Sequence, residues 1–558
     1  MVSDSSQIRS EVDTAAARLQ EQLNAGGFCV ALSGGGHRAT LATIGALMAL
    51  VDRRLNKVVI QIASVSGGSI TNAYVAQRCA FEELAPGELD DIVRDLVSAV
   101  TSRGVVTKTW IVILLGLPAL VAAAIGTLVT LVAATGFAVA AALVAFLGSL
   151  MFAGLVVEWL LDRRYFRLAK PGSGHSRRAS LGSLAERKVD HLFCMTDLVL
   201  GLPVYLSGQQ GGMLYRRLGT ERKWGSPGTP ESGDYGFHTW SASNRTIAET
   251  VRASAGFPGI PPRRYRMVRD PKVPGSLAAP TVAFLADGGL WNNLGTQAQR
   301  EDGFLASYAG RGADGVLRPF GRSPESMPVL AINGSAPLKP SHPGVYRIPG
   351  LAMAAAMLAI TRILTANTVV PRVDSMRASF NRRQWTGSRP ELVDPLDLVV
   401  DLSEVNVSKL FYGAYARGEE EIRKSDPIVK GWERDLVDRA RETLKSSGKS
   451  AGSDLDYLLG APEPQGSPSA AGFADLDQWR YLTNSTAWQR ALACHGPGPL
   501  SVPTTLDRID PEMARRLIAR CYLNTYLASM YLSPLNQDDL VYLGRLPERL
   551  ASLTNRTG

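Results

Sequence analysis

Ser66 is the first residue of this chain whose setting could support chemistry. It follows an apolar run at residues 58–63 and precedes a segment of helical character at residues 69–79. Ser64 and Gly68 stand two positions to either side of it, and a nucleophilic serine in a sharp strand-to-helix turn needs such small neighbours. The usual pattern has glycine at both flanking positions, so Ser64 is a departure. A serine that only caps the following helix fits the same residues.

A glycine loop ends the apolar run at residues 28–32. The backbone N–H groups of Gly34, Gly35 and Gly36 can converge on an anion, which suits the oxyanion formed in acyl transfer. A phosphate would fit such a loop as well, but the spacings typical of nucleotide-binding loops are absent. Arg38, two residues further on, could fix the loop or attract a phosphate headgroup.

Asp287 supplies a carboxylate at the end of another apolar run, at residues 281–286, and two glycines follow it. A carboxylate at the C-terminal end of a strand is well placed to reach a serine on the same edge of the sheet. An Asp-Gly turn, in which the side chain only binds its own backbone, explains the same residues. The residues alone leave both interpretations open.

The segments around these residues alternate between strand and helix character. The expected strands are residues 28–32, 58–63, 191–195, 281–286 and 329–333, and helical stretches such as residues 40–50 and 69–79 separate them. This alternation predicts an α/β fold with a largely parallel sheet. The turns that hold the serine and the glycines then lie at one edge of that sheet.

Five segments, in this order, resemble the patatin-like phospholipase family. They are Ser-Gly-Gly-Gly-His-Arg at 33–38, Ser-Val-Ser-Gly-Gly-Ser at 64–69, Thr-Asp-Leu with Gly-Leu-Pro-Val at 196–204, Ala-Ser-Ala-Gly-Phe-Pro-Gly-Ile-Pro-Pro at 253–262, and Asp-Gly-Gly-Leu-Trp-Asn-Asn at 287–293. The match spans residues 27–335 apart from an inserted apolar segment, and it continues weakly to residue 445. The glycine loop followed by arginine, with Ser-Gly-Gly-Ser at the turn, is also similar to the related cytosolic phospholipases.

The resemblance implies a three-layer α/β/α sandwich with a largely parallel central sheet and a serine–aspartate dyad without histidine. It assigns Ser66 as the nucleophile and Asp287 as the general base in the cleavage of fatty-acyl esters of phospholipids. The three loop glycines become the oxyanion hole, and no metal or cofactor is expected. Because a carboxylate is a weak base in water, Asp287 should be partly buried with a raised pKa.

An uncharged stretch interrupts the chain between the serine and the aspartate. Residues 109–157 contain 49 consecutive uncharged positions, of which 38 are hydrophobic. As a straight helix they would extend about 73 Å, against a hydrocarbon core of roughly 30 Å, so two spans fit better than one. We therefore expect a transmembrane helical hairpin at residues 109–161. A buried helical hairpin inside a large soluble domain is the alternative.

Basic residues flank this stretch on both sides. The exit carries a cluster that could also contact anionic lipid: Arg163, Arg164, Arg167, Lys170, Arg177 and Arg178. The positive-inside rule then places the catalytic domain and both termini in the cytoplasm, and we expect a bacterial inner membrane. The other expected partner is the phospholipid substrate itself. A solvated surface is the competing explanation for the basic cluster.

Composition narrows the class of protein. With 558 residues, 45% hydrophobic and 20% charged, the chain is globular rather than disordered or collagen-like. The five cysteines are scattered, without a Cys-x-x-Cys pair or the spacing of a disulfide framework. This argues for a reducing compartment and against a disulfide scaffold or structural zinc. The formal charge of +9 is compatible with anionic lipid, whereas the sequence lacks the aromatic and basic stripe of a nucleic-acid groove. No nucleic-acid partner is expected.

The expected organisation has six parts. They are an N-terminal helix at 1–26, the first part of the catalytic domain at 27–108, the hairpin at 109–161, the second part of the catalytic domain at 162–445, a Ser/Gly/Pro/Ala-rich linker at 446–475 and a helical C-terminal region at 476–558.

Other functions remain open at this stage. A Ser–His–Asp esterase would use His342, which follows Asp287 in the appropriate order but lies in no supporting motif. His37 lies on the glycine loop, where a structural role fits better than that of a base. A lipid acyltransferase would share the same dyad. A membrane-anchored scaffold without activity is a further alternative, although both Ser66 and Asp287 are present.

Overall fold

The computed structural model describes a little under half of the chain. The described residues are 27–102, 124–127, 154–169, 176–199, 201–209, 211–217, 235–240, 242–256, 262–267, 281–296, 310–311, 317–318, 328–335, 397–402, 485–494, 506–530 and 537–554, with single positions at 369, 372, 373, 376, 482, 532, 533 and 535.

The strands and helices follow one another along the chain. The strands are β1 Phe28–Leu32, β2 Val59–Ser64, β3 Arg167–Ala169, β4 Ser176–Arg178, β5 Asp190–Asp197, β6 Leu202–Ser207, β7 Gly211–Arg217, β8 Tyr235–Trp240, β9 Arg263–Met267, β10 Thr281–Asp287, β11 Gly310–Arg311, β12 Leu317–Arg318, β13 Val329–Asn333 and β14 Asp397–Asp401. The longer helices are α2 Gly36–Asp52, α3 Ser66–Arg78, α4 Asp90–Ser102, α7 Ile247–Ser254, α8 Gly289–Asn292, α17 Thr486–Ala493, α18 Pro511–Ser529, α19 Gln537–Gly544 and α20 Leu546–Thr554. Short helical turns are η1 Leu55–Val58, η2 Phe81–Glu83, η3 Asp162–Phe166 and η4 Leu181–Leu184.

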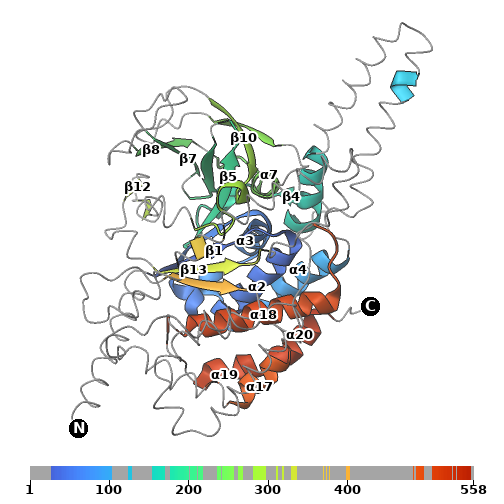
Figure 1. The fold of residues 1–558 in the computed structure, drawn as a ribbon, viewed down its shortest axis with the longest axis vertical. Coiled ribbons are helices and arrows are strands. Elements are labelled where there is room, and N and C mark those ends of the chain that lie inside the picture. Colours follow the sequence, from blue (N-terminus) through green and yellow to red (C-terminus); the bar gives the residue numbers. More distant parts are fainter. Residues whose placement is uncertain are drawn as a thin grey trace, which may run out of the picture.

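A ten-stranded mixed sheet forms the centre of the structure (Figure 1). Its core runs in the order β14-β13-β1-β2-β5, with every neighbouring pair parallel. β6, β7 and β8 extend it in antiparallel order, and β10 joins β5 and β9 in the same antiparallel way. The protein is thus mixed α/β, and the central part of its sheet is parallel, as the alternation of elements predicted. The antiparallel strands beyond β5 were not expected.

The central strands are apolar throughout because both faces of the sheet are covered. In β1, Phe28, Val30 and Leu32 belong to the core on the side of α2 and α3. Cys29 and Ala31 face the opposite core, to which β13 and β14 also contribute alternate residues. Continuous apolar runs of this kind are typical of parallel strands that are buried on both faces.

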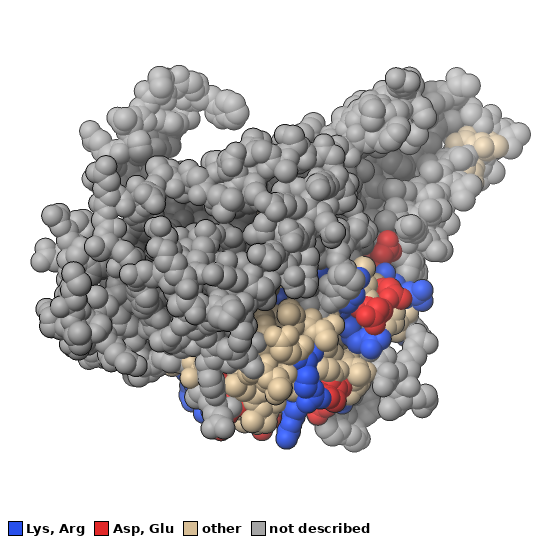
Figure 2. Space-filling model, turned by 60° about the horizontal axis from the view of Figure 1, so that its bottom comes forward, with Lys and Arg blue, Asp and Glu red and all other residues tan. Residues whose placement is uncertain are grey.

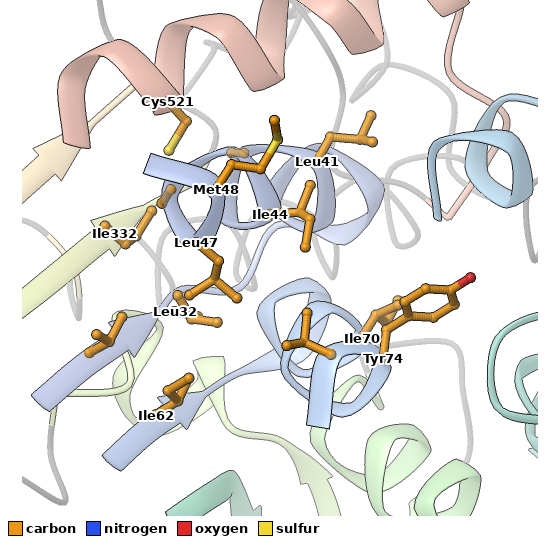
Figure 3. Packing of buried hydrophobic residues seen from close by; sticks show 14 of the residues in the cluster. Leu32, Leu41, Ile44, Leu47, Met48, Ile62, Ile70, Tyr74, Ile332 and Cys521 are labelled. Carbon is orange, nitrogen blue, oxygen red and sulfur yellow. The ribbon is translucent and has the colours of Figure 1, made fainter. Parts of the chain in front are cut away.

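α2 lies between the sheet and α18 (Figure 3). Every residue of α2 is buried, which explains why its sequence is apolar on all sides. A Cβ atom at Gly45 would overlap the Ile518 carbonyl oxygen, so glycine lets α2 and α18 approach closely. The helix that begins at the glycine loop is therefore held on both faces.

The C-terminal helices are part of this packing. Asp510 caps α18 by accepting hydrogen bonds from the backbone N–H groups of Glu512 and Met513, with Pro511 in the first turn. α18 lies within the C-terminal region at 476–558, for which helices were expected.

Arg549 of α20 ties these helices to α2 and α4. It donates to Asp52 Oδ2 (2.6 Å) and to Asp90 Oδ1 (2.6 Å). Tyr522 of α18 donates to the same Asp52 oxygen at 2.7 Å. Asp52 is 1% exposed, and burial raises its pKa while Arg549 opposes that rise. The carboxylate depends on Arg549 for its charge.

Replacing Arg549 by methionine is expected to lower the free energy of unfolding by about 3 kcal/mol, because it leaves a buried carboxylate without its cation. Urea unfolding of both proteins measures this change. Arg490→Met is the matched control, since Arg490 pairs with Glu548 on the surface, where each side chain is more than half exposed. That exposed pair should contribute about 1 kcal/mol or less. Equal losses for the two variants would contradict the assignment.

The expected transmembrane hairpin at residues 109–161 lies mostly outside the described residues. Of this segment, residues 124–127 and 154–161 are described, and both are helical. Among the described residues, no helix has the length and apolarity to cross a membrane. The N-terminal helix expected at 1–26 and the linker expected at 446–475 also lie outside the described part of the chain.

The basic cluster after this segment is partly described. Arg167 and Arg178 both pair with Asp162, at 3.2 Å and 3.4 Å. The Arg163 guanidinium lies over the Trp159 ring, 5.2 Å from its centroid. Two of the expected lipid contacts thus make ion pairs within the protein, and the side chains of Lys170 and Arg177 are outside the described part.

Candidate active site

Ser66 occupies a strained turn between β2 and α3. β2 ends at Ser64 and α3 begins at Ser66 itself, whose φ is 50°. A non-glycine residue in this left-handed region is uncommon, and such strain concentrates at functional sites. A Cβ at Gly67 would overlap the carbonyl oxygen of Gly36, and one at Gly68 would lie 2.6 Å from Leu32 O. The small residues after Ser66 are therefore required by the neighbouring glycine loop.

Ser64 stands where the usual pattern has glycine, and its hydroxyl has a structural role. It donates to the carbonyl oxygen of Leu192 on β5 (3.0 Å) and accepts from Asn72 Nδ2 (2.9 Å). Asn72 Oδ1 in turn lies 2.7 Å from His191 Nδ1. The departure from the usual pattern adds a buried polar network beneath the turn.

β10 brings Asp287 to Ser66 from the opposite direction. β2 pairs with β5 up to Ser64, opposite Phe193, and β10 pairs with β5 from Asp287, opposite Met195. β6 occupies the other edge of β5 along this stretch. β2 and β10 therefore meet head to head on one edge of β5, and their C-terminal ends face each other.

This arrangement corrects the sequence-based rationale for Asp287. A parallel strand ending at the same edge of the sheet was expected, whereas β10 is antiparallel to β5. The aspartate nevertheless lies beside the serine turn, close enough for the Ser66 hydroxyl to lower its pKa.

Asp287 is a buried carboxylate, 3% exposed. Its Oδ1 accepts a hydrogen bond from the Gly289 N–H at 2.7 Å, and its Oδ2 makes no short hydrogen bond to any described residue. Burial raises the pKa of Asp287 to about 6, while the Gly289 N–H and the Ser66 hydroxyl act in the opposite direction. A free carboxylate oxygen with a pKa near neutrality, next to a serine hydroxyl, has the properties of a general base.

The glycine loop lies directly against the nucleophile. A Cβ at Gly34 would come within 3.0 Å of the Ser66 Cβ. The Gly34 N–H donates to the Asn293 carbonyl oxygen (2.9 Å), so it is already engaged. The N–H groups of Gly35 and Gly36 have no acceptor within the described chain, and the φ values of 142° and 62° at these positions favour glycine. These two N–H groups are the stronger oxyanion-hole candidates of the predicted three.

Gly67 adds a candidate donor that the sequence analysis missed. Its N–H is at the start of α3, directly after Ser66, where a helix presents backbone donors without intrahelical partners. The residue after the nucleophile commonly supplies such a donor. Its position beside Ser66 was the available signal.

Arg38 fixes the glycine loop from behind. It is 2% exposed, and its Nε donates to the Gly334 carbonyl oxygen at 2.8 Å. Ser33 Oγ accepts from the Gly334 N–H at 2.7 Å. These contacts join the loop to the end of β13. Of its two expected roles, the geometry favours loop support over contact with a lipid headgroup.

His37 is a neutral structural residue. Its Nδ1 lies 2.7 Å from the Asp507 carbonyl oxygen, which can only accept, so Nδ1 carries the proton. Its Nε2 then accepts from the Tyr165 hydroxyl at 2.9 Å. Burial lowers the pKa of His37 to about 4. His342, the alternative base, lies outside the described residues.

Ser254 is a positioning residue that the sequence analysis did not single out. Its hydroxyl accepts from the Ser66 backbone N–H (3.2 Å) and donates to the Cys194 carbonyl oxygen (2.7 Å). Ser69 Oγ lies 2.8 Å away. The residue therefore joins the nucleophile turn to β5 at the point where β2 and β10 meet.

Ser254→Ala is expected to lower kcat for ester hydrolysis about tenfold with little change in KM, because the Ser66 N–H and the Cys194 carbonyl lose a buried partner worth about 1–2 kcal/mol. Steady-state kinetics on a soluble ester measure this. Ser183→Ala, which removes an exposed hydroxyl that binds only Ser180 O, is the matched control. A change in KM alone would argue against a positioning role.

Comparisons with known proteins add little to this geometry. No family model matches the chain. No curated protein matches it either. Among solved structures, VipD from Legionella pneumophila is similar over 96% of this chain and 92% of VipD, with 13% sequence identity and a TM-score of 0.24. A likeness at this level carries no functional argument, so the function has to be argued from Ser66, Asp287 and the glycine loop.

Proposed function

We propose that this protein is a patatin-like serine lipid acyl hydrolase that cleaves fatty-acyl esters of phospholipids, of the phospholipase A or lysophospholipase type. One observation carries the proposal. A buried carboxylate with a raised pKa, Asp287, lies beside a serine in a strained turn, and the glycine loop contacts that serine. No metal or cofactor is required by this chemistry.

The proposed reaction has two steps. Asp287 Oδ2 takes the proton from Ser66 Oγ as this oxygen attacks the ester carbonyl carbon. The carbonyl oxygen becomes an oxyanion that accepts hydrogen bonds from the N–H groups of Gly35, Gly36 and Gly67. Collapse breaks the ester bond, and the protonated Asp287 gives its proton to the departing alcohol. Water, deprotonated by Asp287, then attacks the acyl-enzyme, releases the fatty acid and restores Ser66.

Membrane association belongs to the same proposal. The uncharged residues 109–157 would hold the enzyme at the bilayer as a helical hairpin, with the catalytic domain in the cytoplasm. A tethered enzyme meets a two-dimensional substrate at high effective concentration.

The test is mass spectrometry of the lipids in phospholipid vesicles incubated with the wild-type protein or with Ser66→Ala. We expect free fatty acid and lysophospholipid from the wild type only. Fatty acid transferred to an added alcohol instead of water would identify an acyltransferase. Loss of turnover in His342→Ala would overturn the dyad in favour of the Ser–His–Asp alternative, and retained turnover in Asp287→Ala would also overturn the dyad. No turnover of any lipid ester by folded wild-type protein would favour the scaffold.

A further inference from the structure

The outer face of β10 is apolar where a polar surface is expected. Along this strand, Ala283 and Leu285 are buried in the core, whereas Val282 and Phe284 point outward and are 36% and 38% exposed. Residues of one strand alternate between the two faces, so these two side chains share one surface. Exposed apolar side chains that form a cluster mark an interaction site more often than scattered ones do.

The β5–β6 turn enlarges this cluster. Leu198 and Val199 are 49% and 63% exposed. The buried Asp197 carboxylate accepts hydrogen bonds from the N–H groups of Val199 and Phe284, both at 3.1 Å. The Leu198 N–H donates to the Phe284 carbonyl oxygen at 2.9 Å. The turn and the strand therefore form one surface held in place by Asp197.

Two arginines border the apolar side chains on β9. Arg266 lies directly opposite Val282, and Arg264 lies opposite Phe284, so both arginines share the outer face. Both are exposed. We call the six residues together the β9–β10 face: Leu198, Val199, Arg264, Arg266, Val282 and Phe284.

The β9–β10 face is close to the active site. Phe284 precedes Asp287 by three residues on the same strand, which corresponds to about 10 Å. Arg263 of β9, which alternates with Arg264 and so points to the core side of the strand, lies 3.4 Å from Glu158. This contact places the helix of residues 154–161 beside β9, on the side of the strand opposite the two arginines of the face. That helix exposes Leu155 and Trp159.

The side chains of the face, together with the sequence of the helix beside β9, indicate what the face contacts. The helix is the end of the uncharged stretch at residues 109–157, whose apolar composition suits a bilayer. Aliphatic and aromatic side chains next to arginines match the acyl and phosphate layers of an anionic lipid surface. A second copy docked through the same face would bring the arginines of two chains together, which is unfavourable.

We propose that the β9–β10 face docks onto the surface of an anionic phospholipid bilayer and thereby orients the active site toward it. The proposal deepens the function proposed above and rests on it. Docking would insert Val199 and Phe284 among the acyl chains while Arg264 and Arg266 contact lipid phosphates. An ester bond at the level of the glycerol backbone would then lie near the end of β10.

The first test compares two substrates for each variant of the full-length protein. The measured quantity is the ratio of hydrolysis on vesicles of equimolar phosphatidylcholine and phosphatidylglycerol to hydrolysis of a dispersed short-chain ester. We expect Val199→Ser/Phe284→Ser and Arg264→Gln/Arg266→Gln each to lower this ratio about tenfold. The loss in the arginine variant should shrink at high salt, since salt screens exposed charges.

The matched control removes exposed apolar side chains elsewhere. Leu492 and Val541 are 39% and 48% exposed, on α17 and α19 at the opposite end of the molecule (Figure 1). The described part of that end presents acidic and basic side chains close together (Figure 2). Leu492→Ser/Val541→Ser should leave the ratio at the wild-type value.

A second test does not depend on activity. Val199→Trp adds one indole to the nine tryptophans of the chain, and Leu492→Trp is its control. In vesicles that contain brominated phosphatidylglycerol, the added fluorescence should be quenched at position 199 and not at 492. Equal quenching of the two, or an unchanged hydrolysis ratio in both double variants, would overturn the docking proposal. If the wild type were a dimer that the double variants convert to monomers while the hydrolysis ratio stays unchanged, the β9–β10 face would instead be a contact between two copies of the chain. If the wild type hydrolyses no ester, quenching still tests docking separately.

Discussion

Asp287→Asn is expected to lower kcat for ester hydrolysis by about three to four orders of magnitude. Asparagine can keep the hydrogen bond from the Gly289 N–H, because its Oδ1 can take the place of the aspartate Oδ1. It cannot accept the proton of Ser66, and general-base catalysis commonly supplies a factor of about 10²–10⁴. Steady-state kinetics on a dispersed ester and on phospholipid vesicles measure the loss.

The wild-type rate should also depend on pH through this carboxylate. The reaction needs Asp287 ionised, and burial raises its pKa to about 6. The rate should therefore be constant above pH 7 and fall about tenfold for each pH unit below pH 6. The residual activity of Asp287→Asn should lack this titration. A rate that falls with a midpoint near pH 4 would show that the base is an ordinary exposed carboxylate.

The same group should lower the stability of the folded protein at neutral pH. The folded-state pKa of about 6 lies above the unfolded value near 3.9, so the folded state binds more protons between these values. Stability contributed by this group is thus present below about pH 4 and is lost as the pH rises to about 6. Asp287→Asn, which carries no charge, should be more stable than the wild type at pH 7, by up to about 3 kcal/mol.

A matched control separates the loss of the general base from the loss of any other buried carboxylate. Asp190 is 1% exposed at the other end of β5, where it accepts from Gln61 Nε2 at 3.1 Å. Asp190→Asn should retain turnover and the wild-type pH profile. If both variants lost activity equally, the effect would come from disturbance of the sheet and not from a missing base.

The sequence predicted best those features that are formed by contiguous segments of the chain. β1 with its glycine loop, and β2 with the serine turn, are contiguous stretches in which an apolar strand, small turn residues and a helix follow directly. The first residues of the helices were harder to predict, since α2 begins at Gly36 and α3 at Ser66, a few positions before the helical stretches expected at 40–50 and 69–79. Glycine and serine are weak helix formers, so the pattern of apolar residues only becomes clear a few positions later.

Long-range pairing explains what the sequence could not predict. An apolar run such as residues 281–286 reads the same for a parallel and an antiparallel strand, so the direction of β10 was not visible. The engagement of the Gly34 N–H by Asn293 and the support of Ser66 by Ser254 join segments far apart in the chain. Those contacts decide which loop N–H groups remain available to an oxyanion.

The contact between the serine turn and the glycine loop should make Gly67→Ala one of the most damaging small substitutions in the chain. The new methyl group would overlap the Gly36 carbonyl oxygen and approach the Gly36 carbonyl carbon to 2.8 Å. These are backbone atoms next to a proposed oxyanion donor, and they cannot rotate away as a flexible side chain would. The loop and Ser66 must therefore move apart.

We expect Gly67→Ala to lower kcat about 10²–10³-fold, which is the usual effect of losing an oxyanion donor. KM should change little, because the oxyanion forms only in the transition state. The midpoint of the pH profile should stay near 6, since Asp287 keeps its surroundings. Gly256→Ala is the control: Gly256 accepts from the Asp287 N–H, yet its nearest Cβ contact is an ordinary 3.4 Å. Wild-type kcat in Gly67→Ala would mean that the stabilising donors lie elsewhere. A shifted pH midpoint would mean that the substitution acts through Asp287.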